Sequence, residues 1–408
     1  MSAVFSSDVV VVGSGPAGSA TALFLARAGF DVALLDRSPF PRPKPCGEYL
    51  TPGAVRLLRD EIGVLPELMR QGAARLTRET VVPHRAAPFG GATDALACPR
   101  IVTDTVLRDA ARAAGARVFD GISVREVLRD GAGVRGVSGT DDNGAPVEFR
   151  AKVTVGADGS RSLLARTLGV VRPISRLQRL ALVAHYAPAD GDIAEDEAGT
   201  AVTMHLPRDG SDACCGVGPA CGPDRARNVN LVVPLSEAPR MAGRRQAYFE
   251  SCLRDAFPEV WEGVRDAPMT GPLLSVGCFG HHTTRAAGDG AVLVGDAATF
   301  IHPFTGEGVY FALRGAQMAS DAIARALEAG DVSRRGLRGY DSARRADLLP
   351  RYRLCDAVQR VVHSPPLLAW ASSRLRRSEP LTGLLLRAVG DLARPADLFS
   401  LGTLRLAL

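Results

Sequence analysis

The sequence predicts an α/β fold, in which a discontinuous domain with a parallel sheet is joined to a second domain with an antiparallel sheet. Three observations support this prediction. Residues 8–36 follow the order strand, glycine-rich turn, helix and strand, which is typical of a βαβ unit. An apolar strand that ends in glycine and aspartate returns near residue 295. Between these patterns, residues 176–284 show poor helical periodicity and short alternating runs, which indicate an antiparallel sheet.

The first half of the chain alternates between strands and helices. A run of valines over 8–12 indicates a strand buried on both faces of a parallel sheet, and the Ala/Leu-rich segment 17–28 indicates the crossover helix. Closely spaced prolines keep the following segment irregular until a helix begins near Pro52. An amphipathic helix over 101–114 and a β-meander that ends at 153–155 complete this half.

The second half begins with the alternating runs LALVAHYA, TAVTMHL and NVNLVVPL, which predict strands. A long helix is expected over 305–327, and helices broken at Pro365, Pro380 and Pro395 follow from residue 336. We expect the chain to divide into a discontinuous Rossmann-like domain with a parallel sheet and a β-meander (1–75, 96–175 and 285–335), an antiparallel-sheet domain (76–95 and 176–284) and a C-terminal helical segment (336–408).

Composition excludes several classes of protein. The 408 residues carry a net charge of +5, and no Lys/Arg block with interleaved aromatic residues indicates nucleic-acid binding. No window of apolar residues is long enough for a transmembrane helix. The N-terminus lacks the basic region of a signal peptide, so we expect a cytoplasmic protein with reduced thiols. The eight Cys and seven His show neither CxxC nor HExxH spacing, and no metal site is expected.

The sequence GSGPAG over 13–18 has the G-x-G-x-x-G spacing that binds a dinucleotide. Gly13 allows the tight turn, Gly15 lets the backbone approach a pyrophosphate, and Gly18 lets the helix pack against the strand. The helix N-terminus then offers free N–H groups to the phosphates. Asp36 ends the next strand, where a carboxylate can accept hydrogen bonds from a ribose.

Two further glycine–aspartate corners follow apolar strands. Asp158 and Gly159 form the first, which could equally be a turn without a ligand. Gly295 and Asp296 form the second, at the carboxyl end of a strand, where ligands bind in open α/β sheets. The segment PFTGEGV over 303–309 could then place backbone amides and a helix N-terminus beside a flat ring.

Together the three motifs resemble the FAD-binding family that contains p-hydroxybenzoate hydroxylase-type aromatic hydroxylases, flavin-dependent halogenases and geranylgeranyl reductases. The resemblance implies an FAD-binding domain and a substrate-binding sheet domain. It places Asp36 on the adenosine ribose, Asp296 on the ribityl chain, and Arg100 near the FAD phosphate or ribityl region. The residues that it implies for FAD binding are Gly13, Gly15, Pro16, Ala17, Gly18, Asp36, Arg37, Cys46, Gly47, Arg100, Asp158, Gly159, Gly295, Asp296, Pro303, Gly306, Glu307, Gly308 and Val309.

The segment KPCGEYLTP over 44–52 bears on the reaction. It resembles the KxCG segment of geranylgeranyl and menaquinone reductases, and also a K-x-C-G-E segment of flavoprotein hydroxylases. The chain lacks the aromatic-rich strand of the reductases and the WxWxIP strand of the halogenases. The resemblance therefore favours a monooxygenase that hydroxylates a hydrophobic aromatic, polyketide or lipid-like molecule through NAD(P)H-reduced FAD and a C4a-hydroperoxide.

Two alternatives to this activity stay open. One is a reductase or dehydrogenase that acts on C=C bonds of an isoprenoid or polyketide. The other is a flavin-binding protein without turnover. NAD(P)H is expected to bind only transiently, because the sequence has one dinucleotide motif.

Three residues are candidates for catalysis near the flavin, namely Cys46, Glu48 and His302. Cys46 could equally be a buried apolar residue, and His185 and His205 lie on predicted strands where hydrogen-bonded histidines are common. The C-terminal segment from residue 363 mixes leucine, Trp370 and arginine. It could cover the substrate domain, or lie on a membrane surface and collect a lipid substrate. The oligomeric state is left open.

Overall fold

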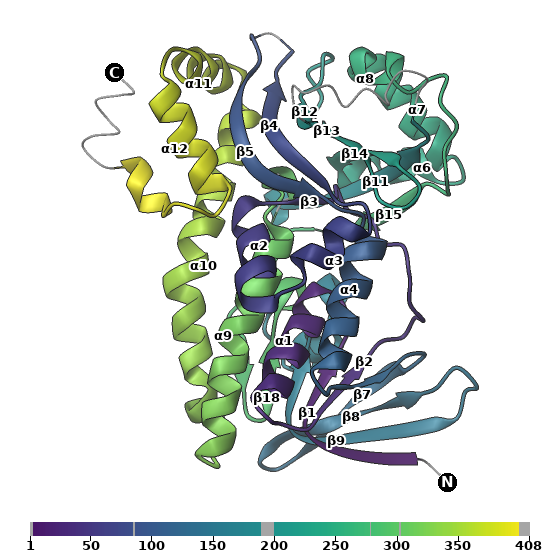
Figure 1. Ribbon diagram of the computed structural model, residues 1–408, viewed down its shortest axis with the longest axis vertical. Helices are drawn as coiled ribbons and strands as arrows, with labels where there is room; N and C mark the ends of the chain where they lie inside the picture. Colours follow the sequence, from purple (N-terminus) through teal and green to yellow (C-terminus); the bar gives the residue numbers. More distant parts are fainter. Residues whose placement is uncertain (1–2, 85, 189–199, 278, 302, 400–408) are drawn as a thin grey trace.

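The computed structural model describes residues 3–84, 86–188, 200–277, 279–301 and 303–399 (Figure 1). A largely parallel sheet, called sheet A here, is built from β1 (Ala3–Val12), β2 (Val32–Leu35), β6 (Arg117–Phe119), β7 (Ser123–Asp130), β8 (Gly133–Thr140), β9 (Pro146–Gly156), β17 (Ala287–Gly288) and β18 (Ala291–Leu293). Its order is β17-β18-β9-β1-β2-β6, and β8 and β7 continue from β9 as an antiparallel meander. β1 runs parallel to β2 and β9, and β18 runs parallel to β9, so their carboxyl ends meet at one edge.

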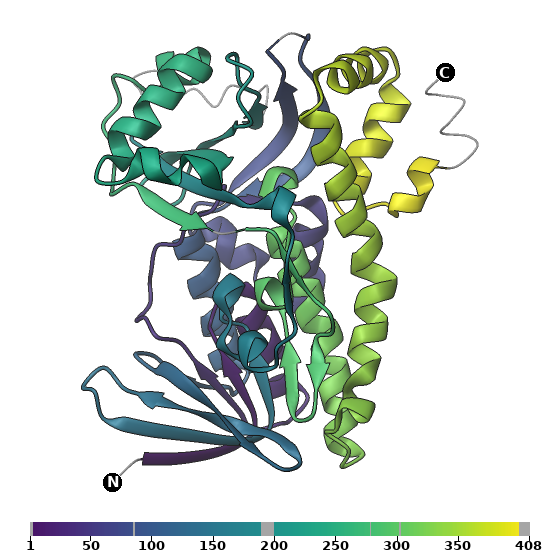
Figure 2. The same ribbon diagram turned by 180° about the vertical axis from the view of Figure 1, so that it is seen from behind.

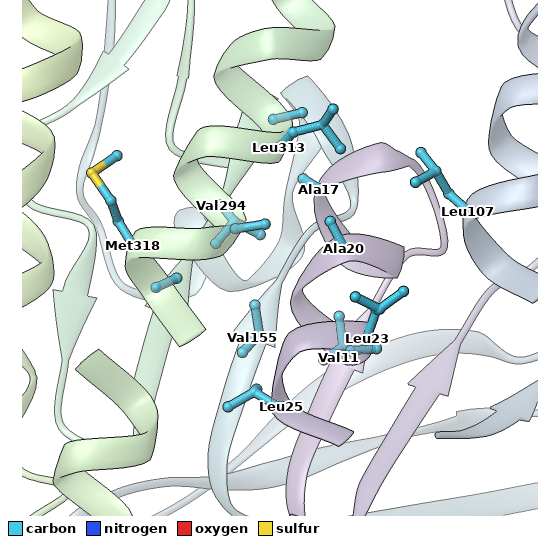
Figure 3. Close-up of a cluster of buried hydrophobic side chains, with 14 of the residues drawn as sticks. Val11, Ala17, Ala20, Leu23, Leu25, Leu107, Val155, Val294, Leu313 and Met318 are labelled. Atoms are coloured by element: carbon cyan, nitrogen blue, oxygen red, sulfur yellow. The ribbon is translucent and has the colours of Figure 1, made fainter. Parts of the chain in front are cut away.

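Three helices pack on sheet A, namely α1 (Pro16–Arg27), α4 (Arg100–Ala113) and α9 (Gly308–Glu328). Figure 3 shows Leu313 of α9 beside Ala17 and Ala20 of α1, with Leu107 of α4 on the other side of α1. All four side chains are buried. Because alanine side chains are small, α1 can lie close to both neighbours, and this packing fixes the N-terminus of α1 at the edge where the strands end.

A second sheet, sheet B, lies at the other end of the molecule (Figure 1). It is built from β3 (Tyr49–Leu50), β4 (Ala74–Val82), β5 (Phe89–Ala97), β11 (Arg179–Tyr186), β12 (Thr200–His205), β13 (Cys214–Cys221), β14 (Ala226–Pro234) and β15 (Leu274–Gly277). The order is β15-β11-β14-β13-β12-β4-β5-β3. All neighbours are antiparallel except β12 and β4, which are parallel. Three short strands form a small third sheet: β10 (Val171–Pro173), β16 (His281–Thr283) and β19 (Thr299–Phe300).

The two faces of sheet B have different neighbours. One face packs against α6 (Ala238–Met241), α7 (Arg245–Ala256) and α8 (Pro258–Glu262) in a buried apolar cluster. The other face turns Ala181 and Val232 toward Val362 and Leu368 from the C-terminal helices. The remaining short helices are α2 (Pro52–Leu57), which continues into a π-helical turn (Leu58–Ile62), α3 (Leu65–Arg70) and α5 (Leu163–Thr167).

The C-terminal helices connect the two ends of the molecule. They are α10 (Arg334–Val362), α11 (Pro365–Arg377) and α12 (Glu379–Val389). Figure 2 shows α10 running along the length of the molecule, from the side of sheet A to α11 and α12 beside sheet B. In the described part of the chain, no helix combines the length and the apolar character needed to cross a bilayer.

The predicted α/β class is confirmed, and so are the parallel sheet with its meander, the mainly antiparallel second sheet and the C-terminal helices. Two details were wrong. The helix predicted over 305–327 begins only at Gly308, because Pro303–Thr305 forms a separate 3₁₀ turn and Gly306 has a φ of +72°. No strand was predicted at β13, where dense glycine and proline mask a segment that is hydrogen-bonded on both sides.

Candidate functional site

The three glycine–aspartate corners converge at the carboxyl ends of β1, β9 and β18. A Cβ atom on Gly13 would lie 2.5 Å from the carbonyl oxygen of Ala157, so the first corner touches the second. A Cβ atom on Gly295 would lie 2.7 Å from Cβ of Ala17, so the third corner touches the first. Both glycines have positive φ angles, which larger residues rarely adopt. Close packing therefore requires glycine at these corners.

Gly15 differs from these packed glycines because the space beside it is open. No atom lies within 4 Å of the position that its Cβ would take, and Gly308 is open in the same way. Gly15 is also the N-cap of α1, where unpaired backbone N–H groups favour an anion. An open cradle at a helix N-terminus fits a pyrophosphate.

Asp36 stabilises the glycine turn as well as facing the cavity. Its carboxylate accepts hydrogen bonds from the backbone N–H of Ser14 at 2.8 Å and of Ser38 at 3.0 Å, and Arg42 lies 3.3 Å away. The side chain is buried. These bonds fix the carboxylate at the end of β2, where the sequence predicts a contact with ribose.

The other two aspartates are held at the same edge by short local bonds. Oδ2 of Asp158 accepts a hydrogen bond from Leu163 N at 2.7 Å, whereas its buried Oδ1 has no partner among the described residues. Asp296 accepts a hydrogen bond through its backbone oxygen from His281 Nε2, at 2.9 Å. Burial raises the pKa of Asp296, and the cations Lys44 and Arg100 offset part of this rise. Both carboxyl groups have capacity for hydroxyl donors of a ligand.

Arg100 is the first residue of α4 and is buried. Its guanidinium forms a two-pronged ion pair with Asp104, at 2.6 and 2.8 Å, and Arg42 lies 3.5 Å from the same carboxylate. Burial lowers the pKa of Lys44, which lies on the same loop as Arg42. This cationic group fits the phosphates of a dinucleotide.

Glu48, directly before β3, forms a hydrogen-bonded pair with His185 of β11. Oε1 of Glu48 lies 2.9 Å from Nε2 of His185, and Asn228 lies 3.2 Å from the same ring nitrogen. Burial is the largest single influence on His185 and opposes the imidazolium, but the hydrogen bond with Glu48 and the charge of Glu48 together outweigh it and raise the pKa of His185. The second oxygen of Glu48, Oε2, is buried without a partner in the described part of the chain. Glu48 and His185 can therefore share a proton, while Oε2 of Glu48 stays available to a ligand.

The backbone of Glu48 is strained, with a φ of +59° that is uncommon for residues other than glycine. Its carbonyl accepts a hydrogen bond from Cys98 N at 2.8 Å, and its N–H is 3.3 Å from Sγ of Cys46. Burial raises the pKa of Cys46, so this residue stays a neutral thiol. Of the two, Glu48 is the better candidate to exchange a proton with a ligand.

Sequence reasoning missed a second carboxyl group on the cavity wall, Glu79 of β4. Its Oε2 accepts a hydrogen bond from the hydroxyl of Tyr49 at 2.8 Å. Burial raises the pKa of Glu79 to about 7. The alternating sequence of the strand marks Glu79 only as a polar position, so no local signal distinguishes it from a solvent-facing residue.

Glu307 belongs to a buried acidic group that joins the loop directly before α9 to the C-terminal helices. Sγ of Cys355 donates a hydrogen bond to Oε2 of Glu307 at 2.7 Å. Asp391 accepts a hydrogen bond from Thr51 at 2.9 Å and pairs with Arg351 at 3.2 Å. Burial raises the pKa of Glu307 to about 7, and burial together with the charge of Glu307 raises that of Asp391. One of the two carboxyl groups therefore carries a proton near neutral pH.

This arrangement predicts a pH-dependent stability that Glu307→Gln reduces. Because the pKa of Glu307 is raised from 4.5 to about 7, the folded state holds its proton over that window. The stabilisation is complete below pH 4.5 and is lost as pH rises through about 7. The Tm of the wild type should therefore fall more between pH 4.5 and pH 7 than the Tm of Glu307→Gln. The exposed Glu328→Gln is the control, and equal slopes in all three proteins would contradict the assignment.

One cavity of about 1500 Å³ is lined by residues of the three corners together with Glu48, Glu79 and Glu307. It exceeds the usual range for a single small-molecule site, so it has room for a dinucleotide and a second ligand. Beyond the three corners, its wall is largely apolar, with side chains of sheet B on one side and of α10, α11 and α12 on the other. The lining residues include Leu182, Val202, Met204, Val232, Leu354, Val358, Leu375, Leu381, Leu385 and Leu386.

The structure brings most of the predicted site residues to this cavity. Those that line it are Gly13, Gly15, Pro16, Ala17, Asp36, Arg37, Cys46, Gly47, Glu48, Arg100, Asp158, Gly159, Asp296, Gly306, Glu307, Gly308 and Val309. Gly18 and Gly295 lie just behind it, where the corners pack together, and Pro303 begins the 3₁₀ turn before α9. His302 lies outside the described residues. Within the described ranges, no group of three or more Cys, His, Asp or Glu is placed to hold a metal.

The chain is similar to flavoproteins over most of its length. Residues 6–348 match the family model described as FAD binding domain. Menaquinone reductase of Mycolicibacterium smegmatis is 30% identical over 406 residues, which cover 96% of this chain and 93% of that protein. Digeranylgeranylglycerophospholipid reductase 2 of Methanopyrus kandleri is 30% identical over 342 residues, which cover 82% of this chain and 81% of that protein.

A solved structure shares the fold at lower identity. The flavin-dependent brominase Bmp2 superposes with a TM-score of 0.82 at 22% identity, covering 96% of this chain and 97% of that one. The open cradle at Gly15, the uncommitted oxygen of Asp158 and the cations around Arg100 fit the phosphates and hydroxyls of FAD. With a family match over more than half of its residues, the chain belongs to the FAD binding domain family and is an FAD-dependent oxidoreductase.

Proposed function

We propose that this oxidoreductase adds hydrogen to a C=C bond of a long isoprenoid-like lipid. The observation that carries the proposal is the pair of buried Glu48 and half-buried His185, which adjoins an apolar cavity shared with the dinucleotide corners. The relatives with at least 30% identity that are named above are reductases, of menaquinone and of a digeranylgeranylglycerophospholipid by their names. An extended apolar chamber suits a prenyl chain better than a compact ring.

The residues of the three corners would hold FAD in this proposal. Gly13, Gly15 and the N-terminus of α1 would bind the pyrophosphate, Asp36 the adenosine ribose, and Asp158 and Asp296 the hydroxyls nearer the ring. Bound FAD, once reduced by NAD(P)H, supplies the hydride. The open backbone at Gly308 leaves room for the flat ring beside the Glu307 loop.

In this proposal the side chains of the protein supply the proton for the reaction. Addition of hydrogen across a double bond needs a hydride on one carbon and a proton on the other. Glu48 lines the cavity, and His185 holds a proton against it at 2.9 Å. A protonated pair can give its proton to the second carbon and regain one from solvent. The apolar wall from sheet B and the C-terminal helices orients the chain and excludes water.

Hydroxylation, which the sequence resemblance favours, is the second candidate. One observation supports it: the cavity wall at β12 and β13 is made of Val202, Thr203, Met204 and Gly216, without the aromatic residues expected of the reductases. This reaction would consume O₂ and add an oxygen atom to the substrate. The two candidates therefore differ in their need for oxygen.

An anaerobic single-turnover experiment separates the candidates. The holoprotein is reduced with NADPH or dithionite and mixed with menaquinone or a digeranylgeranylglycerophospholipid, and flavin reoxidation is followed by its absorbance. C=C reduction is expected to give a product heavier by two hydrogen atoms. Because a quinone ring can also accept two electrons, the menaquinone product is then exposed to air, which returns a quinol to the quinone but leaves a reduced side chain unchanged. Reoxidation only with O₂, and a product that gains oxygen, would overturn reduction and support hydroxylation.

A further inference from the structure

Helix α11 lies at the end of the molecule that is farthest from the β7–β9 meander, next to β5 (Figures 1 and 2). Leu367 is 48% exposed and Trp370 is 57% exposed on this helix. Five large apolar side chains are exposed in the described part of the chain, and three of them, Leu367, Trp370 and Leu392, lie on or just beyond the C-terminal helices. The other two, Val4 and Ile101, lie elsewhere in the fold and far apart in the sequence.

The charged side chains of α11 are all positive. Its sequence, PPLLAWASSRLRR, has three arginines in the last turns and no acidic residue. Arg376 and Arg377 are exposed, and Arg377 follows Trp370 by seven residues, which places both on one face of the helix. A basic helix with exposed tryptophan and leucine matches the chemistry of an anionic bilayer surface.

The apolar cavity reaches this surface. Trp370, Ala371 and Leu375 of α11 line the cavity together with Leu381 and Leu385 of α12. Because Trp370 is both half-exposed and part of the lining, the cavity opens beside it. A ligand drawn from a bilayer at α11 would enter the chamber without crossing water.

We propose that the α11 surface, formed by Leu367, Trp370 and Arg377 with Arg376 at its edge, docks on an anionic phospholipid bilayer and places the cavity mouth against it. Tryptophan is favoured at the interface between lipid and water, and each arginine near an anionic leaflet adds attraction. Passage of a lipid substrate through this mouth rests on the proposed function, whereas the docking itself does not.

Vesicle co-sedimentation of the full-length holoprotein tests the proposal. The vesicles are phosphatidylcholine alone, or phosphatidylcholine with phosphatidylglycerol, and no substrate is present. We expect binding to the anionic vesicles, and a loss of roughly 30-fold in partition coefficient for both Leu367→Ser/Trp370→Ser and Arg376→Gln/Arg377→Gln. The adjacent exposed pair Arg334→Gln/Arg335→Gln, at the other end of α10, is the charge control, and Val4→Ser is the apolar control. Both controls should bind like the wild type.

A spectroscopic readout locates the contact. The chain has two tryptophans, so Trp261→Phe leaves Trp370 as the sole reporter. Its emission should shift to the blue with anionic vesicles. Wild-type binding by both α11 double variants, or an equal loss in the control variants, would overturn the proposal. So would a shift that follows protein concentration without vesicles, because the surface would then bind a second copy of the chain. Turnover of a detergent-dispersed substrate tests the proposed function separately.

Discussion

Gly15→Val is expected to give a folded protein that purifies without flavin. The backbone at Gly15 has a φ of −73° and a ψ of −176°, which a β-branched residue adopts without strain. Since no atom lies within 4 Å of its Cβ position, the Cβ atom of valine meets nothing in the protein itself. Its methyl groups would instead occupy the space at the N-terminus of α1, where the pyrophosphate is expected. The affinity for FAD should fall at least about a hundredfold, which is about 2.7 kcal/mol.

The measurement compares flavin absorbance and circular dichroism of the purified variant. Gly131→Val is the matched control, because Gly131 also has open space at its Cβ position but lies in the turn between β7 and β8. It should retain the yellow colour. Thermal unfolding should match that of the wild-type apoprotein, since loss of a ligand that binds only the folded state lowers Tm. A yellow Gly15→Val protein with full flavin content would show that the cradle does not hold the pyrophosphate.

Glu48→Gln is expected to lower turnover by about 10²–10³-fold while leaving flavin content unchanged. Glutamine keeps the shape of the side chain and tolerates the same backbone, but it cannot hand on a proton. Reduction of the flavin by NAD(P)H should proceed at the wild-type rate, because this step does not need the Glu48–His185 pair. Only reoxidation by substrate should slow, and rapid-mixing absorbance separates the two half-reactions.

Glu79→Gln is the matched comparison for this variant, since Glu79 is another carboxyl group on the cavity wall. We expect it to lose much less activity than Glu48→Gln. In the wild type, the rate of reoxidation should fall as pH rises through the raised pKa of His185, because the pair then loses its proton. Equal losses in both glutamine variants, or a pH profile that Glu48→Gln leaves unchanged, would assign the proton elsewhere.

Local sequence patterns predicted those turns, strands and helix ends that depend only on residues close together in the sequence. The glycine turn at Gly13, the valine strand before it and Asp36 at the next strand end follow from close packing and strand burial, so each is visible within a few residues. The same holds for α2, which begins at Pro52, and for the helix breaks at the later prolines. The predicted corners came together because parallel strands end at the same edge.

The pairings across the chain could not be predicted in this way. Glu48 and His185 are 137 residues apart, and Thr51 and Asp391 are 340 residues apart, so no spacing rule joins them. Glu48 and His185 were each singled out from the sequence, but as separate candidates. Their partnership depends on how β11 of sheet B lies over the loop that carries Glu48, which is a tertiary property.

The contact of Thr51 with Asp391 ties the residues after α12 to the beginning of α2, 340 residues earlier in the chain. Gly53 donates its backbone N–H to Gly390 at 2.8 Å, and a Cβ atom at Gly53 would lie 2.4 Å from Cβ of Asp391. The residues after α12 thus clasp the stretch that follows the strained Glu48. A truncation before residue 390 would therefore do more than remove a wall of the chamber, because it would also remove the contacts that hold the stretch after Glu48 in place.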